Sequence, residues 1–443
     1  MPDSLPSHDR DAGTLPPFPV VGIGAAAGGL SALLGLLEKL PERPGMAFIV
    51  VLHLPAKDEE SAFPILARST SMPVVQVRER LALEPDQVYL VPGGQDLALG
   101  PGSLHTQPAR GSGTGATSID HFFRTLADTC RERAIGIVLS GSGSDGAVGL
   151  RRIREQGGVT LVQAPEDADH AGMPRAALAS SAVDFLLPAA EMPARLLQLW
   201  QNARQIESAV AEARAAPDDE AAEAGATADP GATAPAAEEA EQALREIMEI
   251  LRVRTRHDFR HYKRATVLRR IERRLQVSGM PDLPSYRDHL REHVDETPLL
   301  LQDMLISVTS FFRDRSAMSS LERTVLPNLL QGRKPTDSVR VWVVGCATGE
   351  EAYSIGILLH EQVATMAAPP PIQIFATDID DRAISIARSG VYPGAIANDV
   401  SPARLREFFV QEEDNYRVNK ALRESVLFAS HNILHDAPFS AST

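Results

Sequence analysis

Six short apolar runs separated by helical patterns restrict the fold of the first half of the chain more than any other feature. They occupy residues 18–23, 47–52, 73–77, 87–91, 135–139 and 158–162. Each run has the length of a buried strand, and amphipathic patterns fill most of the intervals. This alternation is typical of a parallel sheet with helices on both faces. We therefore predict a doubly wound α/β domain over residues 17–195.

Residues 20–37 contain no charged side chain, which raises the question of a membrane segment. The same stretch contains five glycines, and the residues before it are acidic (Asp3, Asp9 and Asp11) instead of basic. A signal peptide needs a positively charged front end. A strand, a glycine turn and the start of a helix explain the stretch better, so no membrane insertion is expected.

The net charge of the 443-residue chain is −14, which argues against nonspecific binding of nucleic acid. Half of that charge lies in residues 201–240, which carry nine acidic and two basic side chains and are rich in alanine. We predict an acidic linker at 200–240 and a flexible tail at 1–16. The only cysteines, Cys130 and Cys346, form no metal-binding spacing, so we expect no metal site and a cytoplasmic location.

Residues 241–325 combine helical periodicity with concentrated positive charge. The stretch 252–274 contains ten Lys or Arg side chains and two acidic ones. Leu268, Ile271 and Leu275 share one face of a helix, and most of the arginines fall on other faces. The pattern predicts a small all-helical domain that presents a basic surface.

A second alternation of strands and helices begins near residue 338. Apolar runs at 339–344, 372–377 and 426–429 indicate strands, and residues 350–363 have the pattern of a helix. We therefore predict a second, Rossmann-like α/β domain over residues 326–443.

The first chemical motif lies at the end of the first predicted strand. Residues 24–28 read Gly-Ala-Ala-Ala-Gly, the glycine spacing of a nucleophile elbow, with Ala26 at its centre. His53 follows the second strand, and Asp145 lies in a Gly- and Ser-rich loop after the fifth. A histidine oriented by an aspartate is the usual means of activating a hydroxyl. A degenerate phosphate loop and a purely structural histidine remain alternatives from these residues alone.

Four ordered motifs resemble the catalytic domain of the CheB-type chemotaxis protein-glutamate methylesterases, over about residues 18–190. The motifs are IGAAAGG at 23–29, VLHLP at 51–55, LSGSGSDGA at 139–147 and AGMPRAA at 171–177. The resemblance implies that Ala26, His53 and Asp145 occupy the three positions of a catalytic triad.

Alanine in the nucleophile position is the chief departure from this family. Because Ala26 has no nucleophilic atom, no acyl-enzyme can form on it. We expect an intact methylesterase-like fold with little or no esterase activity. Natural degeneration and an engineered knockout both remain open as the origin of Ala26.

The second chemical motif opens the helix of the later domain. Residues 345–351 read GCATGEE, between a predicted strand and helix, and Asp378 ends the next strand. Glycines allow a backbone to approach a ligand closely, and an acid at a strand end typically binds ribose hydroxyls. The glutamates suit a cationic sulfonium better than a pyrophosphate, which favours S-adenosylmethionine over NAD. A dehydrogenase and a simple helix cap stay as alternatives.

Five further segments resemble the CheR-type protein-glutamate O-methyltransferases over residues 245–443. They lie at 258–274, 308–314 (VTSFFRD), 341–354, 375–380 (FATDID) and 428–434 (FASHNIL). The resemblance implies that S-adenosylmethionine is the cofactor. It places cofactor contacts at Thr309, Arg313, Gly345, Gly349, Glu350, Glu351, Asp378, Asn432 and Ile433. It also leads us to expect a domain that is incomplete at its C-terminus, since the family continues with further strands.

The arginine-rich helix has a role in this family as well. The resemblance implies that Arg269, Arg270, Arg273 and Arg274 contact the glutamate-bearing helices of a chemoreceptor. A solvated helix face is the structural alternative, and nucleic-acid binding is disfavoured because no aromatic side chains are interleaved with the arginines.

The sequence therefore predicts a methylesterase-like domain fused to a methyltransferase that modifies glutamates of chemoreceptors or other signalling proteins. The alternatives are a noncatalytic receptor-binding scaffold and a hydrolase that uses another nucleophile. The sequence leaves open which receptor is modified and in what oligomeric state the chain works.

Overall fold

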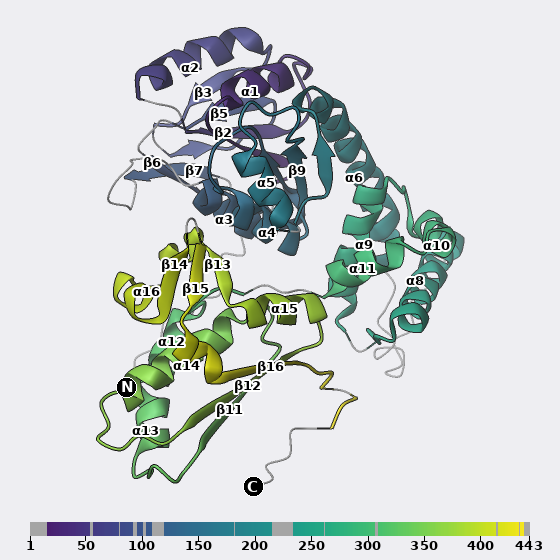
Figure 1. Cartoon of the computed structure of the whole chain (residues 1–443). Helices are drawn as coiled ribbons and strands as arrows, with labels where there is room; N and C mark the ends of the chain where they lie inside the picture. The colour runs from purple at the N-terminus through teal and green to yellow at the C-terminus, as the bar shows by residue number, and fades with distance from the viewer. Residues whose placement is uncertain are drawn as a thin grey trace, which may run out of the picture. The chain divides into compact units, whose positions relative to one another are not determined.

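A computed structural model provides the fold (Figure 1). It describes residues 16–53, 56–78, 80–91, 95–100, 103–108, 119–180, 182–214, 234–260, 262–305, 309–412, 415–433 and 435–437. The chain divides into two compact units, Met1–Met304 and Leu305–Thr443. The tail predicted at 1–16 lies almost entirely outside the described residues.

The first unit is built on a seven-stranded sheet with the strand order β10-β9-β8-β1-β2-β5-β3. Every neighbouring pair is parallel. The strands are β1 (Val20–Ala25), β2 (Ala47–Leu52), β3 (Val74–Gln76), β5 (Gln87–Leu90), β8 (Ala134–Val138), β9 (Val159–Gln163) and β10 (Phe185–Leu187). All six predicted apolar runs are strands of this sheet. The seventh, β10, is short and partly exposed, and its sequence gives little signal.

Helices cover both faces of this sheet, which confirms the doubly wound fold. The surrounding helices are α1 (Gly29–Leu37), α2 (Ala56–Ser69), α3 (Ile119–Cys130), α4 (Ala147–Glu155), α5 (Gly172–Ala179) and α6 (Met192–Arg214). One core cluster joins Val21 and Ile23 of β1 to α1 and α6. The other contains Val20 together with Phe122 of α3 and Leu150 of α4. Alternate residues of one strand thus enter the two cores.

The stretch considered as a membrane segment contains β1, a turn and α1, as expected. No helix in the described part of the chain is long and apolar enough to cross a membrane.

A small antiparallel sheet beside the main one was not predicted. It has the order β4-β7-β6, from Leu81–Ala82, Ser103–Pro108 and Gln95–Gly100. Polar residues such as Gln95, His105 and Gln107 interrupt these strands, so no continuous apolar run marks them.

Helices extend into both ends of the segment predicted as a linker. Helix α6 continues to Arg214, and α8 (Ala234–Thr255) begins before residue 240. Parts of the predicted linker are therefore helical, and residues 215–233 lie outside the described residues.

The helical domain completes the first unit. It consists of α8, α9 (Arg264–Ser278), α10 (Leu283–Glu292) and α11 (Glu296–Met304). The apolar face predicted for α9 is buried, with Leu268, Ile271 and Leu275 at its centre.

The second unit has a three-stranded parallel sheet, β11-β12-β16, from Val339–Val344, Ile372–Asp378 and Val426–Ser430. Helix α14 (Glu350–Val363) has the bounds predicted for it, and α15 (Asp381–Ser389) follows β12. A second antiparallel sheet, β13-β15-β14, was not predicted; its strands are Val391–Pro393, Asn415–Val418 and Phe409–Glu412.

The boundary between the helical domain and the second sheet domain differs from our expectation. We placed it near residue 325, whereas the two units divide between Met304 and Leu305. Phe311 and Phe312 enter the core of the second unit together with Val343 and Ile357. The helices α12 (Arg315–Ser320) and α13 (Leu326–Leu330) therefore belong to the second unit, a packing preference that helical periodicity cannot reveal.

Candidate functional site

Three adjacent strands bring Ala26, His53 and Asp145 to one edge of the first sheet. Ala25, the last residue of β1, pairs with Leu52 at the end of β2. The next residues continue this register, since the backbone N–H of His53 donates to Ala25 O at 2.9 Å. Strand β8 flanks β1 on the other side, and Asp145 lies in the loop that follows it.

The histidine and the aspartate face one another. His53 Nε2 lies 3.7 Å from Asp145 Oδ2, and both side chains are partly exposed. The carboxylate is fixed from behind by backbone N–H groups of Ile119 (2.9 Å), Asp120 (2.8 Å) and Gly146 (2.9 Å). Two of these donors start α3, so the aspartate sits at the positive end of a helix.

A second carboxyl group lies beneath this pair. Asp120 is buried and accepts a hydrogen bond from the backbone of Gly149 at 2.6 Å. Burial and the neighbouring Asp145 charge raise the pKa of Asp120 to about 7.

Ala26 occupies a tight turn between β1 and α1. Its backbone N–H donates to Ser140 O at 2.9 Å, and Gly28 has a φ of 73°. A Cβ atom at Gly28 would lie 2.6 Å from Asp169 Cβ, so only glycine fits this close approach. The turn has the shape of a nucleophile elbow, but its central side chain is a methyl group.

Ser140 and Cys130 carry nucleophilic atoms in the first domain, and neither atom is poised to react. Ser140 is buried; its hydroxyl donates to Ala27 O at 2.8 Å and accepts from the backbone N–H of His170 at 2.9 Å. Burial raises the pKa of the Cys130 thiol to about 12, so that thiol stays protonated at neutral pH. Within the described ranges, no cluster of His, Cys, Asp and Glu side chains could hold a metal ion.

Three loops meet at the corresponding edge of the second sheet. The backbone N–H of Ala347 donates to Asp378 Oδ2 at 2.7 Å, and that of His431 donates to Asp378 O at 2.9 Å. Asp378 therefore connects the loop after β11 with the segment after β16. The N–H of Asp380 also donates to Asp378 Oδ1, at 2.9 Å.

The loop after β11 has the unusual backbone that its glycines predicted. Gly345, Ala347 and Gly349 all have positive φ values, of 68°, 48° and 95°. The first turn of α14 then presents Glu350 and Glu351. Glu350 is buried and accepts a hydrogen bond from Thr348 Oγ1 at 2.6 Å, whereas Glu351 is exposed.

The segment that contains Thr309 and Arg313 is attached to the same helix. Phe312 N–H donates to Ser354 Oγ at 3.0 Å, one turn beyond Glu350. Arg313 is exposed, and Thr309 is half-buried. After β16, Asn432 N–H donates to Asp436 Oδ2 at 2.7 Å, and Ile433 is 57% exposed.

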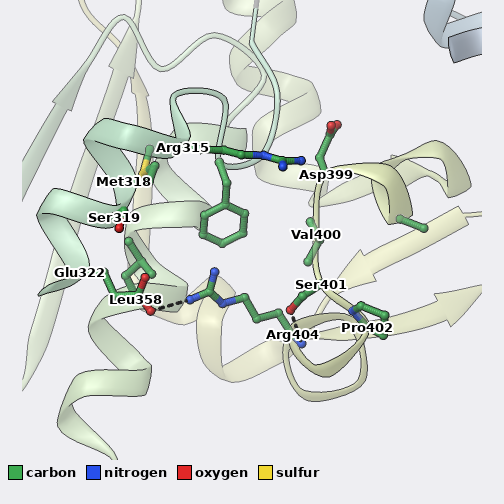
Figure 2. A pocket seen from close by; sticks show the side chains of 12 residues that line it. Arg315, Met318, Ser319, Glu322, Leu358, Asp399, Val400, Ser401, Pro402 and Arg404 are labelled. Carbon is green, nitrogen blue, oxygen red and sulfur yellow. Dashed lines mark hydrogen bonds and ion pairs between the residues drawn. The ribbon is translucent and has the colours of Figure 1, made fainter. Parts of the chain in front are cut away.

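Behind this segment lies a cavity of about 390 Å³ that the sequence did not predict. Phe312 and Arg404 both line it. Figure 2 shows Arg404 pointing toward Glu322, with which it forms an ion pair at 3.1 Å. The Arg404 guanidinium lies 4.6 Å from the centre of the Phe312 ring and also pairs with Glu361 at 2.7 Å. These contacts fix the position of the segment that precedes α12.

The four arginines of α9 are not placed together on a free surface. Arg269 is exposed and Arg270 is half-buried. Arg273 and Arg274 are buried; Arg273 pairs with Asp184, and Arg274 pairs with Glu296 at 2.8 Å. The expectation that all four contact a receptor must be corrected, because buried ion pairs within the unit already engage two of them. Sequence reasoning missed Asp184, which directly precedes the short strand β10 and belongs to no motif.

Comparisons with known families agree with this division of the chain. Residues 21–196 match the CheB methylesterase family, residues 242–305 match the all-alpha domain of CheR methyltransferases, and residues 307–442 match the CheR S-adenosylmethionine-binding domain.

Individual relatives cover different parts of the chain. An uncharacterised 104.1 kDa protein of Rhodobacter capsulatus is 34% identical over 85% of this chain, which spans only 39% of that relative. A putative protein-glutamate methylesterase/protein-glutamine glutaminase of Leptospira interrogans is 30% identical over 42% of this chain and 96% of its own length. The crystal structure of the Thermotoga maritima CheB methylesterase catalytic domain aligns with a TM-score of 0.39 and 24% identity, over 41% of this chain and 98% of that one.

The molecule thus combines a methylesterase-type sheet domain with the two domains of a methyltransferase. The chain belongs to the CheB methylesterase family through its first domain, and the whole is a CheB–CheR fusion. The expected fold classes are confirmed, and so is S-adenosylmethionine as the cofactor of the second sheet domain.

Proposed function

We propose that the second unit transfers a methyl group from S-adenosylmethionine to glutamate side chains of chemoreceptors or related signalling proteins. The observation that carries the proposal is the meeting of the loop after β11, Asp378 and the segment after β16 at one sheet edge. The carboxyl edge of a parallel sheet is where such domains bind nucleotide-like ligands.

The side chains at this edge fit the chemistry of the cofactor. The Asp378 carboxylate suits ribose hydroxyls, and its oxygens can accept further hydrogen bonds beyond those from Ala347 and Asp380. Glu350 and Glu351 place acidic groups in the first turn of α14, where a positively charged sulfonium is stabilised. We assign cofactor contacts also to Thr309, Gly345, Gly349, Asn432 and Ile433.

The acceptor needs little activation in this reaction. S-adenosylmethionine supplies an electrophilic methyl group, and a glutamate carboxylate is already ionised and nucleophilic at pH 7. The protein's task is therefore to hold the acceptor oxygen in line and to exclude water. Arg313 is the exposed cation that we assign to orienting a carboxylate, of the cofactor or of the acceptor.

We further propose that the first domain hydrolyses no ester. The His53–Asp145 pair is present, but the elbow position holds Ala26. This feature also favours the second candidate function, a noncatalytic scaffold that binds signalling proteins through both units. A cytoplasmic location remains a prediction from the two cysteines.

Binding of S-adenosylhomocysteine to the purified chain, measured by calorimetry, tests the proposal. We expect Asp378→Asn to weaken binding at least tenfold, because a ribose hydrogen bond is changed. Asp381→Asn is the matched control, since this exposed aspartate lies in the first turn of α15. Binding followed by methyl transfer to a glutamate-rich peptide supports the enzyme, and binding without transfer to any receptor-derived peptide supports the scaffold. Equal binding by both variants would contradict the proposed cofactor site.

A further inference from the structure

Buried groups of opposite charge meet where the first sheet domain contacts the helical domain within the first unit. We propose that the first domain has a second function that does not depend on hydrolysis. Its surface around Asp184 and the C-terminal end of α4 is a docking site for the arginine-rich helix α9 of the same chain. We call this surface the α9 dock and define it by Arg154, Glu155, Gly158, Thr160 and Asp184.

Arg273 is the central residue that enters the α9 dock. Its side chain is wholly buried, and its Nη2 donates to both carboxylate oxygens of Asp184, at 2.5 and 2.6 Å. Its Nε donates to Gly158 O at 3.1 Å, and its Nη1 pairs with Asp303 at the end of α11. Each of the three guanidinium nitrogens therefore has an acceptor, so the buried cation is fully compensated.

The acceptor in the dock is held in place by its own domain. Asp184 Oδ2 accepts a hydrogen bond from the backbone N–H of Thr160 at 3.0 Å, and the backbone N–H of Asp184 donates to the Thr160 hydroxyl at 3.0 Å. The hydroxyl of Thr160 also donates to Ala182 O, at 2.5 Å. A carboxylate fixed in this way loses little conformational freedom when the guanidinium binds, which favours tight docking.

A second ion pair joins the two domains, with the arginine on the first sheet domain and the acid on the helical domain. Arg154 of α4 donates to Asp303 Oδ1 at 3.0 Å, so Asp303 receives arginines from both domains. Burial alone would raise the pKa of Asp303, but Arg273, Arg154 and Arg274 outweigh it and keep the pKa below its usual range.

The end of α4 supplies an additional acceptor. Arg270 Nη2 donates to Glu155 O at 2.7 Å, at the last residue of that helix. Unpaired carbonyl groups give a helix C-terminus a negative character, which suits a cation. Helix α6 lies against both α8 and α9 and extends the contact beyond the charged groups.

These contacts differ from the exposed ion pairs elsewhere on the first domain. Exposed pairs contribute little, whereas removing one member of a buried pair leaves an uncompensated charge. Arg273 and Asp184 are each needed to neutralise the other in this arrangement. The docking function gives the methylesterase-like fold a role that the side chain at position 26 does not affect.

The test uses the full chain with a protease recognition sequence placed within residues 217–230, between α6 and α8. The folded protein is cleaved there, and association of the two pieces is measured by analytical ultracentrifugation over a range of dilutions. We expect the cleaved pieces to stay together at micromolar concentration. Separation of the pieces at that concentration would overturn the proposal.

Variants then locate the interaction. Asp184→Asn should weaken association of the cleaved pieces about 100-fold, in line with the loss of one member of a buried ion pair. Asp128→Asn is the control, because it removes a similar but exposed ion pair with Arg152. Equal association of the two variants would contradict the α9 dock.

A further variant covers the case in which Asp184→Asn fails to fold, since Asp184 also binds Thr160. Arg154→Met changes a residue of α4 instead of a strand and removes the pair with Asp303. It should weaken association about tenfold and speed hydrogen exchange of α9 amides in the uncleaved chain. Unchanged association and exchange would again contradict the proposal. Neither the association of the pieces nor the hydrogen exchange of α9 depends on methyl transfer. Both measurements therefore test the docking proposal even if the proposed enzyme activity is absent.

Discussion

The imidazole Nε2 of His53 lies 3.7 Å from Oδ2 of Asp145, at the same sheet edge as the methyl group of Ala26. Three backbone N–H groups still hold the carboxylate, and the tight turn at Gly28 still begins α1. The His53–Asp145 pair is therefore present beside a turn whose central side chain lacks a reactive atom.

Restoring a hydroxyl at this position should restore chemistry. We expect Ala26→Ser to release methanol from a methylated glutamyl peptide at least about 1,000-fold faster than the parent chain, since loss of a triad member usually costs that much or more. Methanol release under single-turnover conditions measures the gain. The double variant Ala26→Ser/His53→Ala should return to the parent rate. A folded Ala26→Ser protein with parent activity would show that the remaining geometry is not competent.

The buried Asp120 should make the first domain less stable as the pH rises. Its folded pKa, about 7, lies above the usual value near 3.8, so its stabilising contribution is complete below pH 3.8 and is lost as the pH rises through 7. Asn keeps an acceptor oxygen for the Gly149 N–H and removes the charge. We expect the free energy of unfolding of Asp120→Asn to exceed that of the parent by about 2 kcal/mol at pH 8, with little difference at pH 4.

Chemical denaturation of both proteins at the two pH values measures this difference. Asp128→Asn is the control, because Asp128 belongs to the same helix but is exposed. A stability difference that stays the same from pH 4 to pH 8 would rule out titration of Asp120 as its cause.

The start of α14 should tolerate no side chain at Gly349. This residue has a φ of 95°, and a Cβ atom there would lie 2.8 Å from Ala387 Cβ and 3.1 Å from the Phe428 ring. We expect Gly349→Ala to destabilise the second unit by about 2 to 3 kcal/mol and to weaken S-adenosylhomocysteine binding more than tenfold. Thermal unfolding and calorimetry check the two effects.

Gly332→Ala separates backbone strain from steric overlap. Gly332 also has a positive φ, of 74°, but a Cβ atom there would meet no atom within 4 Å. Its substitution should cost about 1 kcal/mol and leave ligand binding unchanged. If the two alanine variants behaved alike, the close packing of the loop against Phe428 would not matter for the site.

The sequence predicted the strands that are buried on both faces. The strand at 47–52, for example, is apolar throughout because helices cover both sides of it. The small antiparallel sheets escaped prediction because their strands are short and polar, as in Asn415–Val418. Local periodicity carries no signal for such strands, which depend on their neighbours.

The candidate sites show the same contrast between local and distant determinants. The elbow around Ala26 and the loop at 345–351 are continuous motifs, so they are visible in the sequence, although glycine spacing alone left their roles open. The burial of Arg273 could not be predicted in this way, because its partner Asp184 is 89 positions away in the sequence. Charge along α9 indicated a binding surface, but only the tertiary structure identifies what that surface contacts.

The two glycines inside β1 restrict which substitutions the first site can accept. Gly22 and Gly24 let α3 lie directly on the strand, where added side chains would overlap Leu126 and Ile119. The same helix begins with the amides that hold Asp145. A residue larger than glycine at position 22 or 24 would displace the helix and shift the acid with it. The position of Asp145 relative to His53 therefore depends on two small residues inside β1.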